Sequence, residues 1–322
     1  MTSQPSFKDL SSEQQVESLS ACVGQVLGQY GLGEHEVESI NHEYNSTFKV
    51  TCDDGRKFAL RVNVNSHRSL ANLNAEIFLV NSIESVTTPK PVENASGDYV
   101  SRGWHEATGR ELNAVLYTWL EGAEPGDEPT LEQVFAMGAA MAKLHIDTVG
   151  LELPPGAELS DLSDFFWGER DWLLGDDSEL GSEEKALIGG AKVKVLEALA
   201  ELQEDSKQQP IHADLHPWNV MWHEGELAVF DFDDCGLGLP VQDLATSLYY
   251  LDTPEQDEAL LAGYKSVAPL PSYTERQMKL LLLQRRISLL NYLYETSNPE
   301  HREMIPKYQA ETFRRIRDNL SS

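Results

Sequence analysis

The sequence has few cysteines, few basic residues and no long apolar run. Its 322 residues include only three cysteines, Cys22, Cys52 and Cys235, which are widely spaced and odd in number. That set suits neither a disulfide framework nor a CxxC metal site, so we expect reduced, partly buried thiols. No stretch approaches the roughly 18 apolar residues of a membrane span, and residues 1–15 contain no apolar signal segment. We therefore expect a cytoplasmic protein.

The shortage of basic residues limits the classes of partner. The chain carries 25 lysines and arginines against 53 aspartates and glutamates, which gives a formal net charge of -28. Nucleic acids and anionic membranes are bound through basic patches, so this charge balance disfavours both as partners. It favours a cationic partner, although general solubility or a saline habitat explains the same acidity equally well.

The apolar pattern predicts two parts of different character. Helical spacing at 13–30 and 70–84 flanks two strand-like runs at 46–52 and 57–62, which are joined by the turn Asp53-Asp54-Gly55. Two further strands are expected at 98–102 and 113–119. Residues 122–129 are rich in glycine, proline and acid, which marks a boundary.

Beyond this boundary the chain reads as mainly helical, with a short β-rich insert at 210–235 that turns at Gly225. The expected helices span 131–145, 183–203, 240–251, 255–264, 275–297 and 303–319. Together these patterns predict an α+β, two-lobed fold. A small β-rich N-terminal lobe, 1–121, precedes a larger, mainly helical C-terminal lobe, 122–322.

The β-rich insert contains the most informative residues. The segment His-Ala-Asp-Leu-His-Pro-Trp-Asn ends at Asn219, and Val-Phe-Asp-Phe-Asp-Asp follows at 229–234. A hairpin that turns at Gly225 can return Asp231 to the loop that carries Asp214 and Asn219. Two oxygen ligands and one further carboxylate would then face one point. Oxygen ligands of this kind suit Mg²⁺, and a carboxylate beside the metal can orient a hydroxyl for attack on phosphorus.

The pattern HxDxxxxN followed by DFD resembles the aminoglycoside phosphotransferase and choline kinase superfamily, the small-molecule branch of the kinase-like fold. Three other segments share the resemblance: LYTWLEG at 116–122, MAKLH at 141–145 and GLPVQDLATSL at 238–248. The similarity covers about 40–250. It implies an ATP- and Mg²⁺-dependent phosphotransferase that acts on a hydroxyl of a small molecule.

The resemblance also implies a role for individual residues of the centre. Asp214 would be the catalytic base or hydroxyl-orienting group, and Asn219 and Asp231 would ligate Mg²⁺. His212 would brace the loop by hydrogen bonds, and Asp243 would hold the loop backbone from the following helix. For His216 and Trp218 we expect packing of the loop and no substrate contact.

The ATP site lacks the usual glycine-rich signatures, because neither GxGxxG nor a Walker A motif is present. The tight turn at 43–48 takes that place, where Asn45, Ser46 and Thr47 can supply hydroxyl and backbone N–H groups. Arg61 stands where protein kinases have lysine and can hold phosphate with its planar fork. Glu76 is its expected partner, and backbone groups of Thr118 and Leu120 would hold the adenine.

The acceptor site is the least readable part of the sequence. Candidates are the acidic and aromatic segment 161–184 and the pair Asp233–Asp234, with Arg285, Asn291 and Tyr292 as residues that could close the site. The clustered acids favour a cationic acceptor such as an aminosugar or amino alcohol.

Two alternatives remain open: a bacterial Ser/Thr protein kinase of the same fold, and a non-catalytic nucleotide-binding module. Gln242 follows Asp231 by only eleven positions, which is too short for a long activation segment and favours the small-molecule reading.

Overall fold

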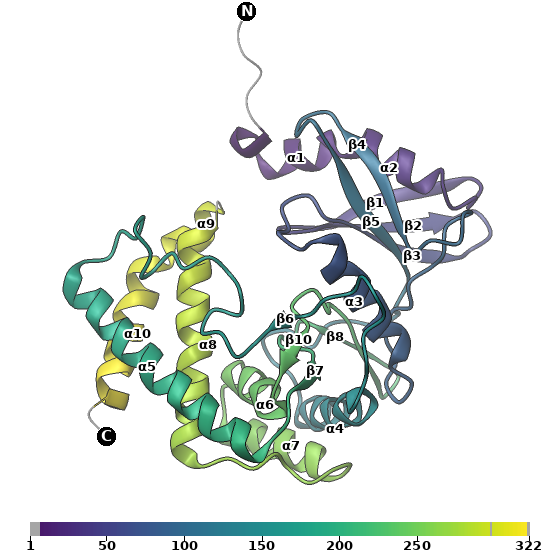
Figure 1. The fold of residues 1–322 in the computed structure, drawn as a ribbon. Helices are drawn as coiled ribbons and strands as arrows, with labels where there is room; N and C mark the ends of the chain where they lie inside the picture. The colour runs from purple at the N-terminus through teal and green to yellow at the C-terminus, as the bar shows by residue number, and fades with distance from the viewer. Residues whose placement is uncertain (1–6, 297, 321–322) are drawn as a thin grey trace, which may run out of the picture. The chain divides into compact units, whose positions relative to one another are not determined.

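Figure 1 shows the computed structural model, which describes residues 7–296 and 298–320. The chain forms two compact units. Unit 1 comprises Met1–Asn81, Thr88–Glu121 and Pro154–Glu158, and unit 2 comprises Ser82–Thr87, Gly122–Leu153 and Leu159–Ser322. The functional division at residue 122 stays a prediction. The two compact units also differ from it in two short segments, because 82–87 belongs to unit 2 and 154–158 belongs to unit 1.

Unit 1 is built on a five-stranded antiparallel sheet in the order β1-β2-β3-β5-β4. The strands are β1 (His35–His42), β2 (Ser46–Cys52), β3 (Lys57–Val62), β4 (Val100–His105) and β5 (Arg110–Thr118). Side chains alternate between faces along β5, since Leu112, Ala114 and Leu116 pack on the cluster that includes Val23 and Val26 of α2 (Ser20–Leu27). The opposite face packs on α3 (Leu70–Ser82), through Val115 and Tyr117 against Leu73 and Ile77.

Two features of unit 1 differ from the sequence expectations. Strand β1 was not predicted, because it is an edge strand with almost no buried side chain and therefore lacks apolar alternation. The single helix expected at 13–30 is two helices, α1 (Ser12–Ser18) and α2, which meet at the fully buried Leu19 and follow a short 3-10 turn, Phe7–Asp9. The three cysteines are free and buried, as expected.

Unit 2 is mainly helical. Its helices are α4 (Leu131–Thr148), α5 (Ser182–Asp205), α6 (Pro240–Tyr249), α7 (Pro254–Lys265), α8 (Glu275–Glu295), α9 (Pro299–Glu303) and α10 (Ile305–Leu320). The end of the helix predicted at 275–297 falls on Ser297, which lies outside the described residues. No helix within the described ranges has both the length and the apolarity needed to cross a membrane.

Short strands in unit 2 frame the segment 212–235. The strands β6 (Ser160–Asp161), β10 (Gly236–Gly238) and β7 (Gln209–Ile211) form one small sheet, and β8 (Val220–His223) pairs with β9 (Glu226–Val229) as a hairpin. The hairpin turns at Glu224 and Gly225, with φ of 50° and 87°. Two successive positive φ values are typical of the tight two-residue turn that joins antiparallel strands, so the predicted turn at Gly225 is confirmed.

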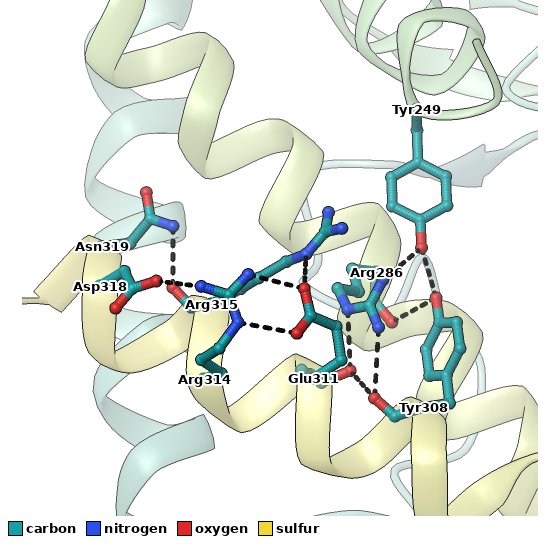
Figure 2. Close-up of polar contacts among 9 residues, drawn as sticks. Tyr249, Arg286, Tyr308, Glu311, Arg314, Arg315, Asp318 and Asn319 are labelled. Atoms are coloured by element: carbon teal, nitrogen blue, oxygen red, sulfur yellow. Dashed lines mark hydrogen bonds and ion pairs between the residues drawn. The ribbon is translucent and has the colours of Figure 1, made fainter. Parts of the chain in front are cut away.

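A buried arginine fixes α8 against α10. The guanidinium of Arg286 donates to the Thr312 hydroxyl (3.0 Å), the Tyr249 hydroxyl (3.3 Å) and the Tyr308 carbonyl (3.3 Å). Figure 2 shows these contacts beside a surface network of Glu311, Arg314, Arg315 and Asp318 on α10. The surface pairs contribute little each, whereas the buried Arg286 fixes the rotation of α8 and so the direction of the neighbouring Arg285.

Helices α4 and α7 approach closely because glycines stand at their crossing. A Cβ atom added at Gly138 would lie 2.0 Å from the Leu260 carbonyl oxygen, and one added at Gly263 would lie 1.9 Å from the Phe135 carbonyl oxygen. Neither backbone oxygen can move aside without shifting a whole helix. The absence of a side chain at both positions is therefore required for this packing.

We predict that Gly138→Ala forces the two helices apart and lowers the free energy of unfolding by about 1–3 kcal/mol. Gly189→Ala in α5 is the matched control, since a Cβ there meets nothing within 4 Å. That change should leave stability equal or raise it by about 0.5–1 kcal/mol through helix propensity. Denaturant melts of both variants test the prediction, and equal stability of Gly138→Ala and wild type would contradict it.

Candidate functional site

The loop 212–219 follows β7, and its shape depends on one buried carboxylate. Asp243 in α6 is fully buried. Its Oδ2 accepts from the backbone N–H of His212 (3.0 Å), and its Oδ1 accepts from that of Ala213 (2.5 Å). The same Oδ2 lies 3.0 Å from Nε2 of His145 in α4. The prediction that Asp243 holds the loop backbone is confirmed by these hydrogen bonds. His145 is a further partner that the sequence did not indicate.

These contacts hold the loop in an uncommon backbone conformation. Ala213 has a φ of 67°, in the left-handed region that residues other than glycine rarely adopt. Such a conformation persists only where surrounding interactions fix it, and here the bond from the Ala213 N–H to Asp243 does so. The following residue, Asp214, is thereby turned away from the backbone path of β7.

His212 braces the loop from inside, as predicted. Its Nε2 donates to the Phe230 carbonyl (2.9 Å), and its Nδ1 accepts from the Asp214 N–H (3.2 Å). Burial lowers the pKa of His212, although the Asp243 charge opposes this shift. A neutral ring with one donor and one acceptor fits both contacts. His212 therefore ties loop 212–219 to the strand end that carries Asp231.

Both oxygens of Asp214 have partners. Arg285 in α8 donates to Oδ1. His216 Nε2 lies 3.3 Å from Oδ2, and the Asn219 side-chain nitrogen donates to the same atom (3.2 Å). Burial raises the pKa of Asp214, but the charge of Arg285, together with the electrostatic and hydrogen-bond contributions of His216, outweighs burial and lowers the pKa to about 2. The carboxylate is therefore ionised and fixed in direction.

Two loop residues pack beside this carboxylate. The His216 ring centre lies 4.4 Å from that of Tyr250, and its Nδ1 accepts from the Trp218 N–H (3.2 Å). Tyr250 also accepts from Arg285 (2.7 Å), and burial raises its pKa to about 12. The packing role expected for His216 and Trp218 fits these contacts. Tyr250 was missed because a tyrosine at a helix end has no distinctive pattern.

The two candidate metal ligands are linked through the backbone. The Phe230 N–H donates to the Asn219 carbonyl (3.1 Å), so Asp231 directly follows the residue that pairs with Asn219. Asn219 turns its side-chain nitrogen toward Asp214, donating to the backbone oxygen (2.8 Å) as well as to the carboxylate. Its side-chain oxygen therefore points the other way. Asp231 is exposed and has a φ of 59°.

In unit 1, Arg61 and Glu76 form a buried ion pair. They are 8% and 4% exposed, and Arg61 of β3 donates to a Glu76 carboxylate oxygen of α3. The Tyr117 hydroxyl lies 3.2 Å from the Arg61 Nη2 and donates to the other Glu76 oxygen (3.1 Å). The predicted pairing is confirmed, and Tyr117 is an additional member. Their role toward ATP stays a prediction.

The other nucleotide candidates lie at the turn after β1 and at the end of β5. Ser46 is fully buried, and its hydroxyl lies 2.6 Å from Nδ1 of His42, so that hydroxyl supports the turn from inside. Asn45 accepts from Asn63 (2.9 Å), and Thr47 is half-buried on β2. The Thr118 N–H donates to the Lys90 carbonyl (2.8 Å), and Leu120 lies just beyond β5.

Several acidic residues in 161–184 stabilise their own loop. Asp161, Asp164 and Asp171 accept backbone N–H groups two to four residues further on, and Asp177 pairs with Arg170. From α8, Asn291 accepts from the Trp172 N–H (2.8 Å) and donates to the Arg170 carbonyl (2.8 Å). The Tyr292 hydroxyl lies 2.8 Å from His301. Arg285, one of the predicted acceptor residues, contacts Asp214 directly.

The fold and this site define a kinase-like phosphotransferase. Residues 36–281 match the phosphotransferase enzyme family, and the chain belongs to that family. It is an ATP-dependent phosphotransferase that acts on hydroxyl groups of small molecules. This sets aside both the protein-kinase and the non-catalytic alternatives.

Individual relatives are distant. Homoserine kinase of Gluconacetobacter diazotrophicus is 27% identical over 247 residues, which is 70% of this chain and 70% of that protein. The structure of a microcompartment-associated aminopropanol kinase is 23% identical, with a TM-score of 0.74 over 93% of this chain and 97% of that one. Amicoumacin kinase hAmiN, in complex with AMP-PNP, Ca²⁺ and Ami, is 18% identical, with a TM-score of 0.72 over 94% and 93%.

We predict that Asp243→Asn disorders loop 212–219. An amide offers one acceptor oxygen where three donors now converge, so the free energy of unfolding should fall by at least about 1.5–3 kcal/mol. Asp252→Asn, at an exposed position beyond α6, is the control and should change stability by less than about 0.5 kcal/mol. Thermal melts and hydrogen exchange of the Ala213 amide test this, and unchanged protection of that amide would contradict it.

Proposed function

We propose that this protein transfers the γ-phosphoryl group of Mg²⁺-ATP to the hydroxyl of a small acceptor that carries an amine, with Asp214 as the catalytic carboxylate. The observation that supports this most strongly is the fixed, ionised Asp214 beside Asn219, with Asp231 one residue after the Asn219 partner Phe230. A carboxylate held in this way can accept a hydrogen bond from a hydroxyl and direct its oxygen.

The reaction follows from that placement. The acceptor oxygen forms a bond to the γ-phosphorus while the bond from that phosphorus to the β–γ bridging oxygen breaks, and ADP leaves. The hydroxyl proton passes to Asp214 and then to solvent. His212 and Asp243 do not take part in proton transfer in this proposal, because their polar atoms already form hydrogen bonds with loop 212–219 and with Phe230. They keep Asp214 in position.

Asn219 and Asp231 fit a magnesium site by the chemistry of their donor atoms. The Asn219 nitrogen is committed to Asp214, which leaves its oxygen for a metal. Among the described residues there is no group of three or more His, Cys, Asp or Glu side chains that could hold a metal ion. Two protein oxygens suit Mg²⁺, which keeps waters and takes further ligands from phosphates. The bound ion would neutralise phosphate charge.

In unit 1 we propose that Arg61 binds ATP phosphates and that Glu76 and Tyr117 set its direction. A buried guanidinium with two fixed partners loses little freedom on binding a ligand. Backbone N–H groups near Asn45 and Thr47 would add donors, and the Thr118 carbonyl with the Leu120 backbone would hold the adenine. The buried Ser46 hydroxyl would contribute only indirectly.

The amine on the acceptor is supported by charge and by relatives. Homoserine and aminopropanol, which name the substrates of two similar kinases, each carry an amine and a hydroxyl. Because Asp161, Asp164 and Asp171 serve their own loop, we assign the amine to Asp233 and Asp234. The charge of Asp234 contributes to raising the pKa of Arg285, which supports this assignment. The net charge of -28 would also attract a cation.

We predict that Asp214→Asn lowers the phosphoryl-transfer rate by about 10²–10⁴-fold, as for other positioned acid–base groups. ATP affinity should survive, because Asp214 is assigned to the acceptor. The measurement is acceptor-dependent ATP consumption against a panel of hydroxylated amines, amino acids and sugars, with Asp252→Asn as the control. Turnover by Asp214→Asn within a few-fold of wild type, or full wild-type activity in excess EDTA, would contradict the proposal.

We predict that Arg61→Ala weakens ATP binding more than Glu76→Ala does, because Glu76 only positions the arginine. Both side chains are buried, so each variant also loses stability, and ATP affinity is to be measured by calorimetry where both are folded. The double variant should lose less than the sum of the two. Lys57→Ala, at a half-buried residue of the same strand that pairs with Glu121, is the control. Losses that simply add would contradict the positioning role.

A further inference from the structure

Arg285 is a buried cation beside the candidate catalytic carboxylate. It is 7% exposed, and its Nη2 donates both to Asp214 and to the Tyr250 hydroxyl. Its guanidinium carbon lies 5.3 Å from the Tyr250 ring centre and 5.8 Å from that of Trp167. Trp167 packs on the cluster that includes Ala213, so these side chains surround one face of loop 212–219.

Two buried hydrogen-bond donors beside this face have no acceptor. Arg285 Nε is buried without a hydrogen-bond partner, and so is Nε1 of Trp167. The Ser288 hydroxyl of α8 and Nε1 of Trp172, whose backbone is held by Asn291 of α8, are also buried without a partner. Three of the four are groups that can only donate. Buried polar atoms are normally paired, so the neighbouring donors of Arg285 and Trp167 call for a ligand with acceptor atoms.

A carboxylate fits the geometry of Arg285. The Nε and Nη2 atoms form one edge of the guanidinium fork, which binds the two oxygens of a carboxylate in parallel. A carboxylate on that edge would satisfy Nε. Nη2 carries two protons, so the ligand can share this donor group while Asp214 keeps its bond to Arg285.

The surroundings hold Arg285 ready for such a ligand. Its neighbour Arg286 is fixed by α10 and Tyr249 on the other side of the helix. Gln284 donates to the Phe165 carbonyl (3.0 Å), and Asn291 holds residues 170 and 172, so α8 also fixes the loop that carries both tryptophans. Helix α8 therefore supports both Arg285 and the loop that carries Trp167.

We propose that Arg285 binds a carboxylate of the acceptor, so that the acceptor is a hydroxy amino acid or a larger molecule with that head group. This inference rests on the proposed function and narrows it. The hydroxyl would lie on Asp214, the amine on Asp233 and Asp234, and the carboxylate on the Nε edge of Arg285 with the Trp167 N–H beside it. The alternative ligand for Arg285 is a phosphate of ATP. Loss of Arg285 would raise the KM for the acceptor in the first case and the KM for ATP in the second.

The test uses acceptor pairs that differ only in the carboxylate: L-homoserine with 3-amino-1-propanol, and L-serine with ethanolamine. Wild-type enzyme should show a kcat/KM roughly 10²-fold or more higher for the better amino acid than for its amino alcohol, since a site built to hydrogen-bond a group rejects analogues that lack it. Arg285→Lys and Arg285→Met should remove most of this preference by raising the acceptor KM, while the KM for ATP stays within a few-fold.

The matched control is Arg276→Lys, an exposed arginine of the same helix paired with Glu201, which should leave both Michaelis constants unchanged. The comparison of acceptor pairs in wild type does not depend on the Arg285 variants folding. A best acceptor without a carboxylate, or an Arg285→Lys variant in which only the KM for ATP rises, would overturn the inference and leave the kinase standing. No ATP consumption with any hydroxylated acceptor would contradict the proposed function itself.

Discussion

The buried carboxylate of Asp243 is the contact on which the site of unit 2 depends. It joins three elements: α6, which carries it; the start of loop 212–219, whose two N–H groups it accepts; and α4, through His145. A buried charge is tolerated only where donors surround it. Here the donors are the loop backbone itself, so the charge is stable only while the loop keeps its conformation.

The closely packed helices α4 and α7 extend this support. Tyr264 of α7 lies 2.9 Å from Nδ1 of His145, so the carboxylate, the imidazole and the phenol form one buried line. Gly138 and Gly263 permit the approach that brings Tyr264 within reach. Residues remote from Asp214 therefore determine where Asp214 points. Unit 1 uses the same principle, since Glu76 and Tyr117 fix the direction of Arg61.

The sequence was informative where chemistry or periodicity leaves a local pattern. The spacing of Asp214, Asn219 and Asp231 indicated the centre, and the turn at Gly225 explained how Asp231 returns to it. The edge strand β1 left no such pattern, because neither of its faces is buried. The contact between Arg285 and Asp214 could not be predicted either. These residues are 71 positions apart, and their meeting depends on how α8 packs, which Arg286 and α10 determine.

In the acidic segment 161–184, the sequence suggested a function that the contacts do not support. Its composition suggested a ligand site, but hydrogen bonds show that Asp161, Asp164 and Asp171 close turns in their own loop. Aspartate is common in such turns because its carboxylate accepts nearby backbone N–H groups. Residue type alone cannot separate that use from ligand binding.

The central claim is that Asp214 directs a small-molecule hydroxyl onto the γ-phosphorus of ATP. Phosphorus-31 NMR of the complete reaction tests it most directly, with wild-type enzyme, Mg²⁺-ATP and the acceptor panel. The account predicts a new phosphomonoester signal that couples to the CH–O proton of the acceptor and grows in step with ADP. A signal from inorganic phosphate alone, or phosphate attached to the protein, would contradict it.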